Sequence, residues 1–226
     1  MKLVYLSLLL TLCFTGNHSQ SIGTVSDGQL IDGVKIPLKG ENYFYFDDLS
    51  YQMDRAYLND KVLNTLLDGY QLMKDQYPER TFGIMEGSNK NGGPIPPHQT
   101  HQNGTSVDFM TPLLAHEKPF TELDHIGASH YLLEFNDDGT YSKNKEVLID
   151  FDCIAAHILA LQEAGKQYGT YVKKVIFKIE LKDELFASPN GQKLKESGIY
   201  FAQKLTQKVN EVHDDHYHVD FGFTNE

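Results

Sequence analysis

The chain has 226 residues, and Asp and Glu outnumber Lys and Arg by 31 to 20, which gives a formal net charge of −11. This acidic balance argues against nucleic acid and against an anionic membrane surface as partners, because both require a basic footprint. Hydrophobic residues make up 40% of the chain and aromatic residues 12%, enough for a sizeable core.

The first 20 residues have the pattern of a secretory signal peptide. Lys2 precedes an apolar run from Leu3 to Phe14, and small and polar residues follow. An apolar run of about 12 residues is too short to span a bilayer, which takes roughly 20. We therefore expect residues 1–20 to be a signal peptide and the protein to be periplasmic.

Cleavage near residues 16–21 would leave a single domain over 21–226, in which only Cys153 remains. A disulfide within the domain and a cysteine zinc site are then excluded. A retained membrane anchor is one alternative to cleavage. Acylation of Cys13 is another, although Leu12 is large for the residue before a lipidated cysteine.

Hydrophobic periodicity and turn residues predict the elements of this domain. In chain order they are a strand at 42–46, a helix at 59–77, a strand at 81–85, a hairpin of strands at 131–135 and 147–151, a helix at 152–167, a strand at 172–181 and a helix at 191–212. This order predicts one α+β domain with a central, mainly antiparallel sheet flanked by helices.

Half of the ten histidines lie in two short segments, and the second of these is His213 to Asp220, HDDHYHVD. In an extended strand residues i and i+2 point the same way. His216 and His218 would therefore leave one face of a strand while Tyr217 leaves the other. Two imidazoles on one face are a metal-ligand geometry.

The first segment, HQTHQNGTSVD, runs from His98 to Asp108 after a glycine-rich loop at 87–93. Asp108 follows His101 by seven residues, and its apolar neighbours would be buried while its carboxylate points the opposite way. A catalytic zinc ion takes three protein ligands from His, Asp and Glu and keeps a position for water. His101, Asp108 and His218 supply such a set. Imidazole ligands favour zinc over magnesium or calcium, and we expect the site at strand and loop ends.

These two segments resemble the penicillin-insensitive murein endopeptidases. That family belongs to a wider zinc peptidase group, with lysostaphin-like enzymes, D-alanyl-D-alanine carboxypeptidases and hedgehog-type proteins, which shares an H-x6-D element and a downstream H-x-H. Here the elements are His101 to Asp108 and His216-Tyr217-His218, preceded by His98 and His213. The likeness extends over most of residues 40–223.

The resemblance implies particular roles for these residues. His101, Asp108 and His218 would bind zinc, His216 would be the base that accepts a proton from the attacking water, and His213 would steady charge in the tetrahedral state. His98 would orient a ligand or substrate, or would only make a hydrogen bond in its loop.

The resemblance also implies the function, an exported zinc metallopeptidase in which zinc-activated water attacks peptide bonds of bacterial peptidoglycan, with D-amino-acid cross-links as the expected target. One alternative is a D,D-carboxypeptidase or dipeptidase of the same group. Another is a non-catalytic, zinc-retaining binding protein.

One departure from the family pattern lies within the first segment. Many relatives carry Asp where this chain has Ser106, so any task of that carboxylate is missing or has moved to Asp214 or Asp220.

Overall fold

The structure is a computed structural model that describes residues 18–224. The expected signal peptide up to residue 17, and with it the alternative of acylation at Cys13, lies outside the described residues. Within them, no helix has the length and apolar character needed to cross a bilayer.

A five-stranded sheet of order β12-β13-β7-β6-β4 forms the centre of the domain, and only its β4–β6 pair is parallel. The expected α+β fold with a mainly antiparallel sheet is confirmed. The bounds of the five strands are β4 Tyr43–Tyr45, β6 Phe82–Ile84, β7 Ser106–Met110, β12 Thr170–Ile176 and β13 His216–Phe223.

The other strands form smaller sheets, of which the largest has the order β10-β11-β8-β9. Their bounds are β1 Gln20–Thr24, β2 Asp27–Ile31, β3 Val34–Lys35, β5 Tyr57–Leu58, β8 Leu113–Ala115, β9 Lys118–Phe120, β10 Thr140–Tyr141 and β11 Asn144–Ile149. The helices are α1 Asp48–Gln52, α2 Asp60–Gln76, α3 Phe151–Tyr168, α4 Lys182–Ala187, α5 Pro189–Glu196 and α6 Gln207–Glu211, with 3-10 turns at Gly127–Leu132 and Ile179–Leu181.

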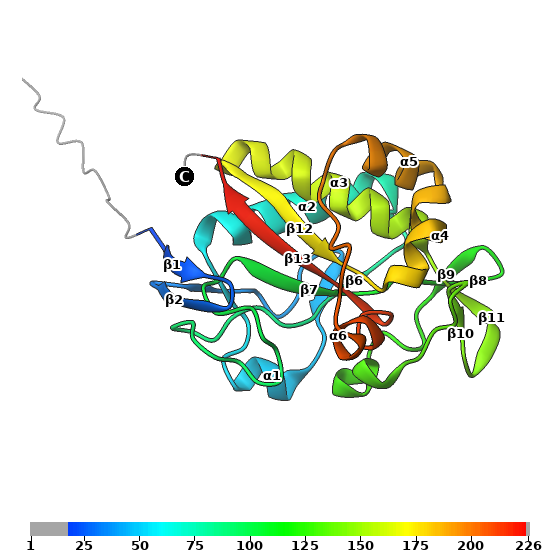
Figure 1. Cartoon of the computed structure of the whole chain (residues 1–226), viewed down its shortest axis with the longest axis horizontal. Coiled ribbons are helices and arrows are strands. Elements are labelled where there is room, and N and C mark those ends of the chain that lie inside the picture. The colour runs from blue at the N-terminus through cyan, green and yellow to red at the C-terminus, as the bar shows by residue number, and fades with distance from the viewer. Residues whose placement is uncertain (1–17, 225–226) are drawn as a thin grey trace, which may run out of the picture.

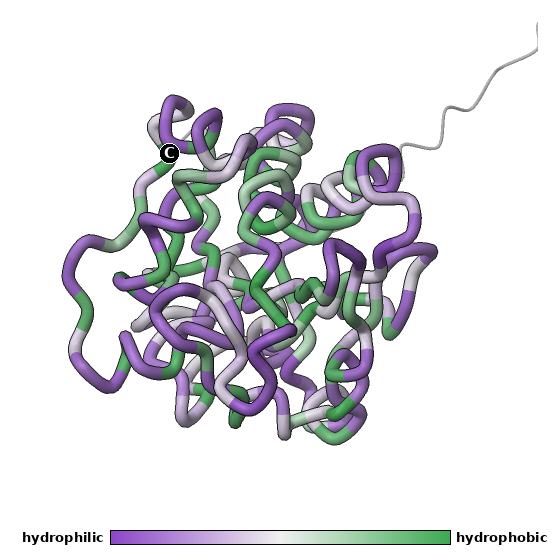
Figure 2. The backbone as a smooth tube through the Cα atoms, turned by 90° about the vertical axis from the view of Figure 1, so that its right-hand side faces the viewer, coloured by the Kyte–Doolittle hydropathy of each residue, from purple (hydrophilic) through white to green (hydrophobic). Residues whose placement is uncertain are grey.

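The long helices α2 and α3 lie together against one face of the central sheet (Figure 1). Tyr217 of β13 reaches His157 of α3, and Phe109 of β7 packs edge-on against Tyr70 of α2. In Figure 2 hydrophobic residues recur along the coils of the helices, and much of the outer loops is coloured as hydrophilic. The apolar core therefore lies between the two helices and this face of the sheet.

The opposite face of the same strands is left for polar groups, because side chains alternate along a strand. Tyr217 and Val219 are buried among core residues, whereas His216, His218 and Asp220 leave β13 on the other side. This alternation confirms the expected placement of the two histidines on one strand face.

The helices expected at 59–77 and 152–167 are confirmed as α2 and α3. The Asn59 side chain accepts a hydrogen bond from the Lys61 N–H at the start of α2, and Asp150 accepts one from the Cys153 N–H at the start of α3. Such N-caps each stabilise a helix by about 1 kcal/mol. The strands expected at 42–46 and 81–85 are confirmed as β4 and β6.

The prediction of a hairpin between 131–135 and 147–151 is wrong for the first of its two strands. Tyr131 lies in the 3-10 turn Gly127–Leu132, and β11 pairs instead with β10. The strand β10 begins at Thr140, whose N–H and hydroxyl both donate to the Asp138 carboxylate.

The prediction of a single helix over 191–212 is also wrong. The chain forms α5 and α6 with an extended segment between them, and Gly198 has φ +75°, outside the helical region. Tyr200 and Ala202 exchange backbone hydrogen bonds with Val175 at the edge of β12. Backbone hydrogen bonds to the sheet therefore replace the intrahelical hydrogen bonds that a helix would make in this segment. The strand expected at 172–181 likewise ends early, at Ile176, and residues 179–181 form a 3-10 turn.

The buried pair of His157 and Tyr217 makes the stability of this core depend on pH. His157 Nδ1 lies 2.6 Å from the Tyr217 hydroxyl, and burial lowers the pKa of His157 to about 3. The unfolded chain binds a proton at this histidine near pH 6.5, whereas the folded chain does not, so stability is lost as pH falls through 6.5. Between pH 7 and pH 5 this group should cost about 2 kcal/mol of unfolding free energy.

Urea denaturation at pH 7 and pH 5 measures this loss of unfolding free energy in the wild type and in the double variant His157→Leu/Tyr217→Phe. The double variant removes the histidine without leaving the Tyr217 hydroxyl unpaired. The variant should lose about 2 kcal/mol less stability than the wild type on acidification. Equal losses in the two proteins would contradict the assignment.

Candidate metal centre

Two adjacent strands of the central sheet, β7 and β13, carry one half of the candidate centre. β13 pairs with β7 so that His218 lies directly opposite Asp108 and Asp220 opposite Ser106. Residues directly opposite in an antiparallel pair have their Cβ atoms about 4.5 to 5.5 Å apart. The register therefore brings the second histidine segment against the end of the first.

The loop before β7 carries the other half. The backbone of His101 has φ +69°, a region that costs a non-glycine residue roughly 1 to 3 kcal/mol. The hydroxyl of Ser88 donates to the His101 carbonyl and accepts from the Gly104 N–H. These bonds hold the loop in the conformation that brings the His101 ring over Asp108.

Ring nitrogens of three histidines surround the Asp108 carboxylate. His218 Nδ1 lies 2.8 Å and His101 Nε2 3.2 Å from Asp108 Oδ1, and His98 Nδ1 lies 3.5 Å from Oδ2. Asp108 is 1% exposed and His101 is fully buried. The two histidine segments, more than 100 residues apart in sequence, thus meet at one carboxylate.

The group of His98, His101 and Asp108 could hold a metal ion, because their ligand atoms lie within 4.8 Å of one another. Within residues 18–224, both ring nitrogens of His101 and Asp108 Oδ2 are buried without a hydrogen-bond partner. Buried polar atoms are normally paired, since leaving one unpaired costs about 1 to 3 kcal/mol. A cation would satisfy the lone pairs, so the residues present fit the metal that the sequence predicts.

Of the predicted ligands, His101 and Asp108 belong to this group, whereas His218 lies against Asp108 without being one of its three members. His98, expected to orient a ligand or to bond within its loop, lies close enough to be a ligand itself. His216 and His213 lie next to this group, with ring centres 4.7 Å apart, and His213 lies 6.5 Å from His218.

A carboxylate lies beside the outer nitrogen of three of these rings. His98 Nε2 lies 2.5 Å from Glu86, His216 Nδ1 lies 2.5 Å from Asp215, and His218 Nε2 lies 2.7 Å from Asp220. Such partners fix the orientation and tautomer of a ligand or catalytic imidazole. Asp214 is not among them, because it binds the Phe135 N–H.

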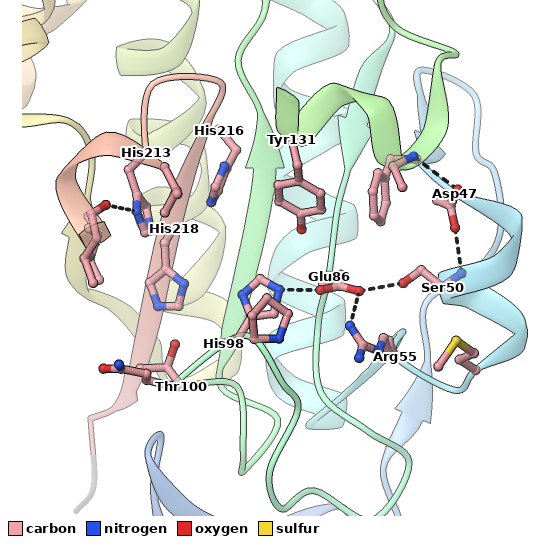
Figure 3. Close-up of a pocket in the computed structure, with 18 of the residues that line it drawn as sticks. Asp47, Ser50, Arg55, Glu86, His98, Thr100, Tyr131, His213, His216 and His218 are labelled. Carbon is pink, nitrogen blue, oxygen red and sulfur yellow. Dashed lines mark hydrogen bonds and ion pairs between the residues drawn. The ribbon is translucent and has the colours of Figure 1, made fainter. Parts of the chain in front are cut away.

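Glu86 was not singled out by the sequence, although it is central to one wall of the site. It follows β6, and the Asp108 N–H donates to its carbonyl at 3.0 Å, which fixes Glu86 beside Asp108. Glu86 Oε1 also accepts from Arg55 Nη1 and from the Ser50 hydroxyl, both at 2.9 Å (Figure 3). Only the pairing of β6 with β7 reveals this position.

The charges of the site compensate one another. Burial alone would raise the pKa of Asp108, but His101 and His218 hold it well below its ordinary value. Burial alone would lower the pKa of His218, but Asp220 and Asp108 raise it to about 9. For His216, burial dominates and lowers the pKa to about 4, so its ring is neutral at neutral pH.

A cavity of about 550 Å³ opens over this cluster. His98, His213, His216 and His218 line it together with Tyr131, and Figure 3 shows these rings gathered at one side, with Glu86, Ser50 and Arg55 beyond His98. Two further walls come from residues 46–55 around α1 and from Lys208, Val209 and Val212 of and after α6. A ligand in the cavity would therefore lie against the histidines.

Four further histidines lie outside this cluster. His116 is exposed, His125 packs against Phe44, and His157 belongs to the core. His130 is buried and its Nε2 lies 2.9 Å from the Asp215 carbonyl, so it supports the segment that carries His216.

Neither the models of known protein families nor the curated protein sequences contain a match to this chain.

Metal binding should stabilise the fold through the Asp108 cluster. At a free zinc concentration 100 times the dissociation constant, the unfolding free energy of the wild type should rise by about 2.7 kcal/mol. Asp108→Asn and His101→Ala should lose this increment because each removes a ligand. Urea denaturation with zinc and with a chelator measures it.

His116→Ala is the matched control, since His116 is exposed and lies outside the cluster. It should keep the full increment. An undiminished increment in Asp108→Asn would place the zinc elsewhere.

Proposed function

We propose that this protein is a zinc-dependent hydrolase. The observation that carries the proposal is that the ligand groups around Asp108 meet beside an open cavity lined by further imidazoles. A purely structural zinc site is closed by its protein ligands, whereas a catalytic one keeps a position open to solvent and substrate.

His101, Asp108 and His218 would hold the ion, and His98 lies close enough to Asp108 to take the place of one of the two histidines. Imidazole nitrogens with one carboxylate favour zinc over magnesium or calcium, which prefer oxygen ligands. When bound, zinc polarises a substrate carbonyl and makes water more acidic at neutral pH.

His216 is suited to accept a proton at Nε2. Its Nδ1 lies against Asp215 Oδ1, and with the ring proton on Nδ1 the lone pair of Nε2 is free. Burial keeps the ring neutral, which is the form that accepts a proton. The same nitrogen can then donate this proton to a leaving amine.

His213 has a different hydrogen-bonding pattern. Its Nδ1 lies 2.6 Å from the Val209 carbonyl, which can only accept, so Nδ1 carries the proton and Nε2 of the neutral ring is an acceptor. Burial, reinforced by His216, lowers the pKa of His213 to about 3. At neutral pH the His213 ring is therefore neutral and would accept a hydrogen bond from the substrate. The role of steadying negative charge, which the resemblance implies, requires the protonated ring.

The proposed substrate is a peptide of bacterial peptidoglycan, cut within its cross-links by a protein acting in the periplasm. The substrate and the location rest on the resemblance of the two histidine segments to murein endopeptidases, together with the pattern of residues 1–20. The acidic net charge argues against nucleic acid or an anionic membrane surface as the partner.

A D,D-carboxypeptidase is the alternative within enzymes, and it requires a cation for the terminal carboxylate of its substrate. Arg55 lines the cavity, but its guanidinium is already bound to Glu86 and to the Pro96 carbonyl, at 2.9 and 2.7 Å. This favours cleavage within a chain. Lys208, exposed on α6, is the cation that a carboxypeptidase would have to use.

Turnover of defined muropeptides by the domain of residues 21–226, with and without a chelator, tests the proposal. Conversion of cross-linked dimers to monomers, abolished by the chelator and restored by zinc, is expected. Release of terminal D-alanine instead would establish the carboxypeptidase. Bound zinc without any turnover would leave a zinc-retaining binding protein.

Two histidine variants should separate binding from catalysis. His216→Ala should retain zinc but lose about 100- to 10,000-fold in hydrolysis, the usual contribution of general base catalysis. His218→Ala should lose the metal itself. Zinc content after gel filtration and muropeptide turnover measure the two effects, and equal zinc loss in both variants would refute this division of roles.

A further inference from the structure

Asp220 has no direct contact with the cavity over the histidines, yet it is bonded to one of the proposed ligands. The residue is 2% exposed. Its Oδ1 lies 2.7 Å from His218 Nε2 and accepts a hydrogen bond from the Ser106 hydroxyl at 2.6 Å. Its Oδ2 pairs with Lys174 Nζ at 2.7 Å. Three donors therefore surround a single buried carboxylate.

The sheet register is the cause of this convergence. Asp220 of β13 lies directly opposite Ser106 of β7 on one side and Lys174 of β12 on the other. The β12 register shifts between Val172 and Lys174, so that Lys174 is the partner of Asp220 in place of Lys173. A bulge of this kind re-aims a side chain at the cost of a disrupted ladder.

The two nitrogens of His218 have different surroundings. Nδ1 lies 2.8 Å from Asp108 Oδ1, on the side of His101, whereas Nε2 faces Asp220. An ionised carboxylate accepts hydrogen bonds but cannot donate one, and a neutral imidazole has one N–H and one lone pair. A proton on Nε2 would satisfy Asp220 and leave the lone pair on Nδ1.

We infer that Asp220, held by Lys174 and Ser106, is a positioning residue that makes Nδ1 of His218 the metal-binding nitrogen. This inference rests on the proposed zinc site. It assigns a role to Asp220, Lys174 and Ser106, which do not line the cavity over the histidines. It also gives Ser106 a role: its hydroxyl donates to Asp220, whereas an aspartate there would place a second carboxylate directly opposite it.

Zinc affinity, measured by competition with a chromophoric chelator, tests the inference in the variant Asp220→Asn. Loss of such a carboxylate partner weakens metal binding about 10- to 100-fold, and we expect a loss in this range. Lys174→Met, which frees one oxygen of Asp220 but leaves the bond to His218, should show a smaller loss.

Asp150→Asn is the matched control. Asp150 is also a buried, paired carboxylate, bonded to Arg80 at 2.5 Å, but it caps α3 and touches none of the histidines of the site. This variant should lose stability while keeping its zinc affinity within about twofold, a range well below the effect of a metal ligand's partner. Equal zinc affinities of Asp220→Asn and Asp150→Asn would overturn the inference.

A second measurement needs no variant and so does not depend on how Asp220→Asn folds. Long-range ¹H–¹⁵N correlation spectra of the zinc-loaded wild type distinguish a protonated from a metal-bound ring nitrogen. The spectra should show His218 protonated at Nε2 and bound to zinc at Nδ1. Zinc on Nε2 would overturn the inference even if the protein hydrolyses peptidoglycan.

Failure of the proposed function is separable from failure of this inference. A wild type that binds no zinc would overturn both. A wild type that binds zinc through Nδ1, with weakened binding in Asp220→Asn but no muropeptide turnover, would overturn the enzyme and support the positioning role.

Discussion

The buried negative charge of Asp108 is the constraint on which the site depends. An ionised carboxylate in a protein interior costs several kcal/mol unless donors or cations compensate it. Here the loop with His98 and His101 and the strand with His218 both close on the carboxylate, and their rings hold its pKa low. The groups that stabilise this charge in the folded chain are the groups suited to share a cation.

The same strands build the core and the site because their side chains alternate. On β13, Tyr217 and Val219 face α2 and α3, while His216, His218 and Asp220 face the other way. A slip of one residue in the pairing of β13 with β7 would exchange the two sets and bury histidines among aromatic rings. The free energy of burying Tyr217 and Val219 therefore also fixes the geometry of the imidazoles.

Patterns within a single segment made the main features predictable. The apolar spacing from 59 to 77 defined α2, and the alternation in His216-Tyr217-His218 placed two rings on one face. Contacts between distant segments were not predictable in this way. Glu86 acts through backbone pairing with Asp108, and the helix expected at 191–212 is broken because Tyr200 and Ala202 pair with the edge of β12. In both cases the deciding hydrogen bonds join segments that are distant in sequence.

The Ser88 hydroxyl, which ties the His101 carbonyl to the Gly104 N–H, bears on how the proposed site would take up a metal ion. Small zinc modules order their chain only when the metal arrives, so part of the binding free energy is consumed by folding. In this protein, bonds that involve no ligand side chain already hold the loop in place. A cation that binds the proposed site would therefore meet a loop that is already ordered, and little of its binding free energy would be consumed in ordering that loop.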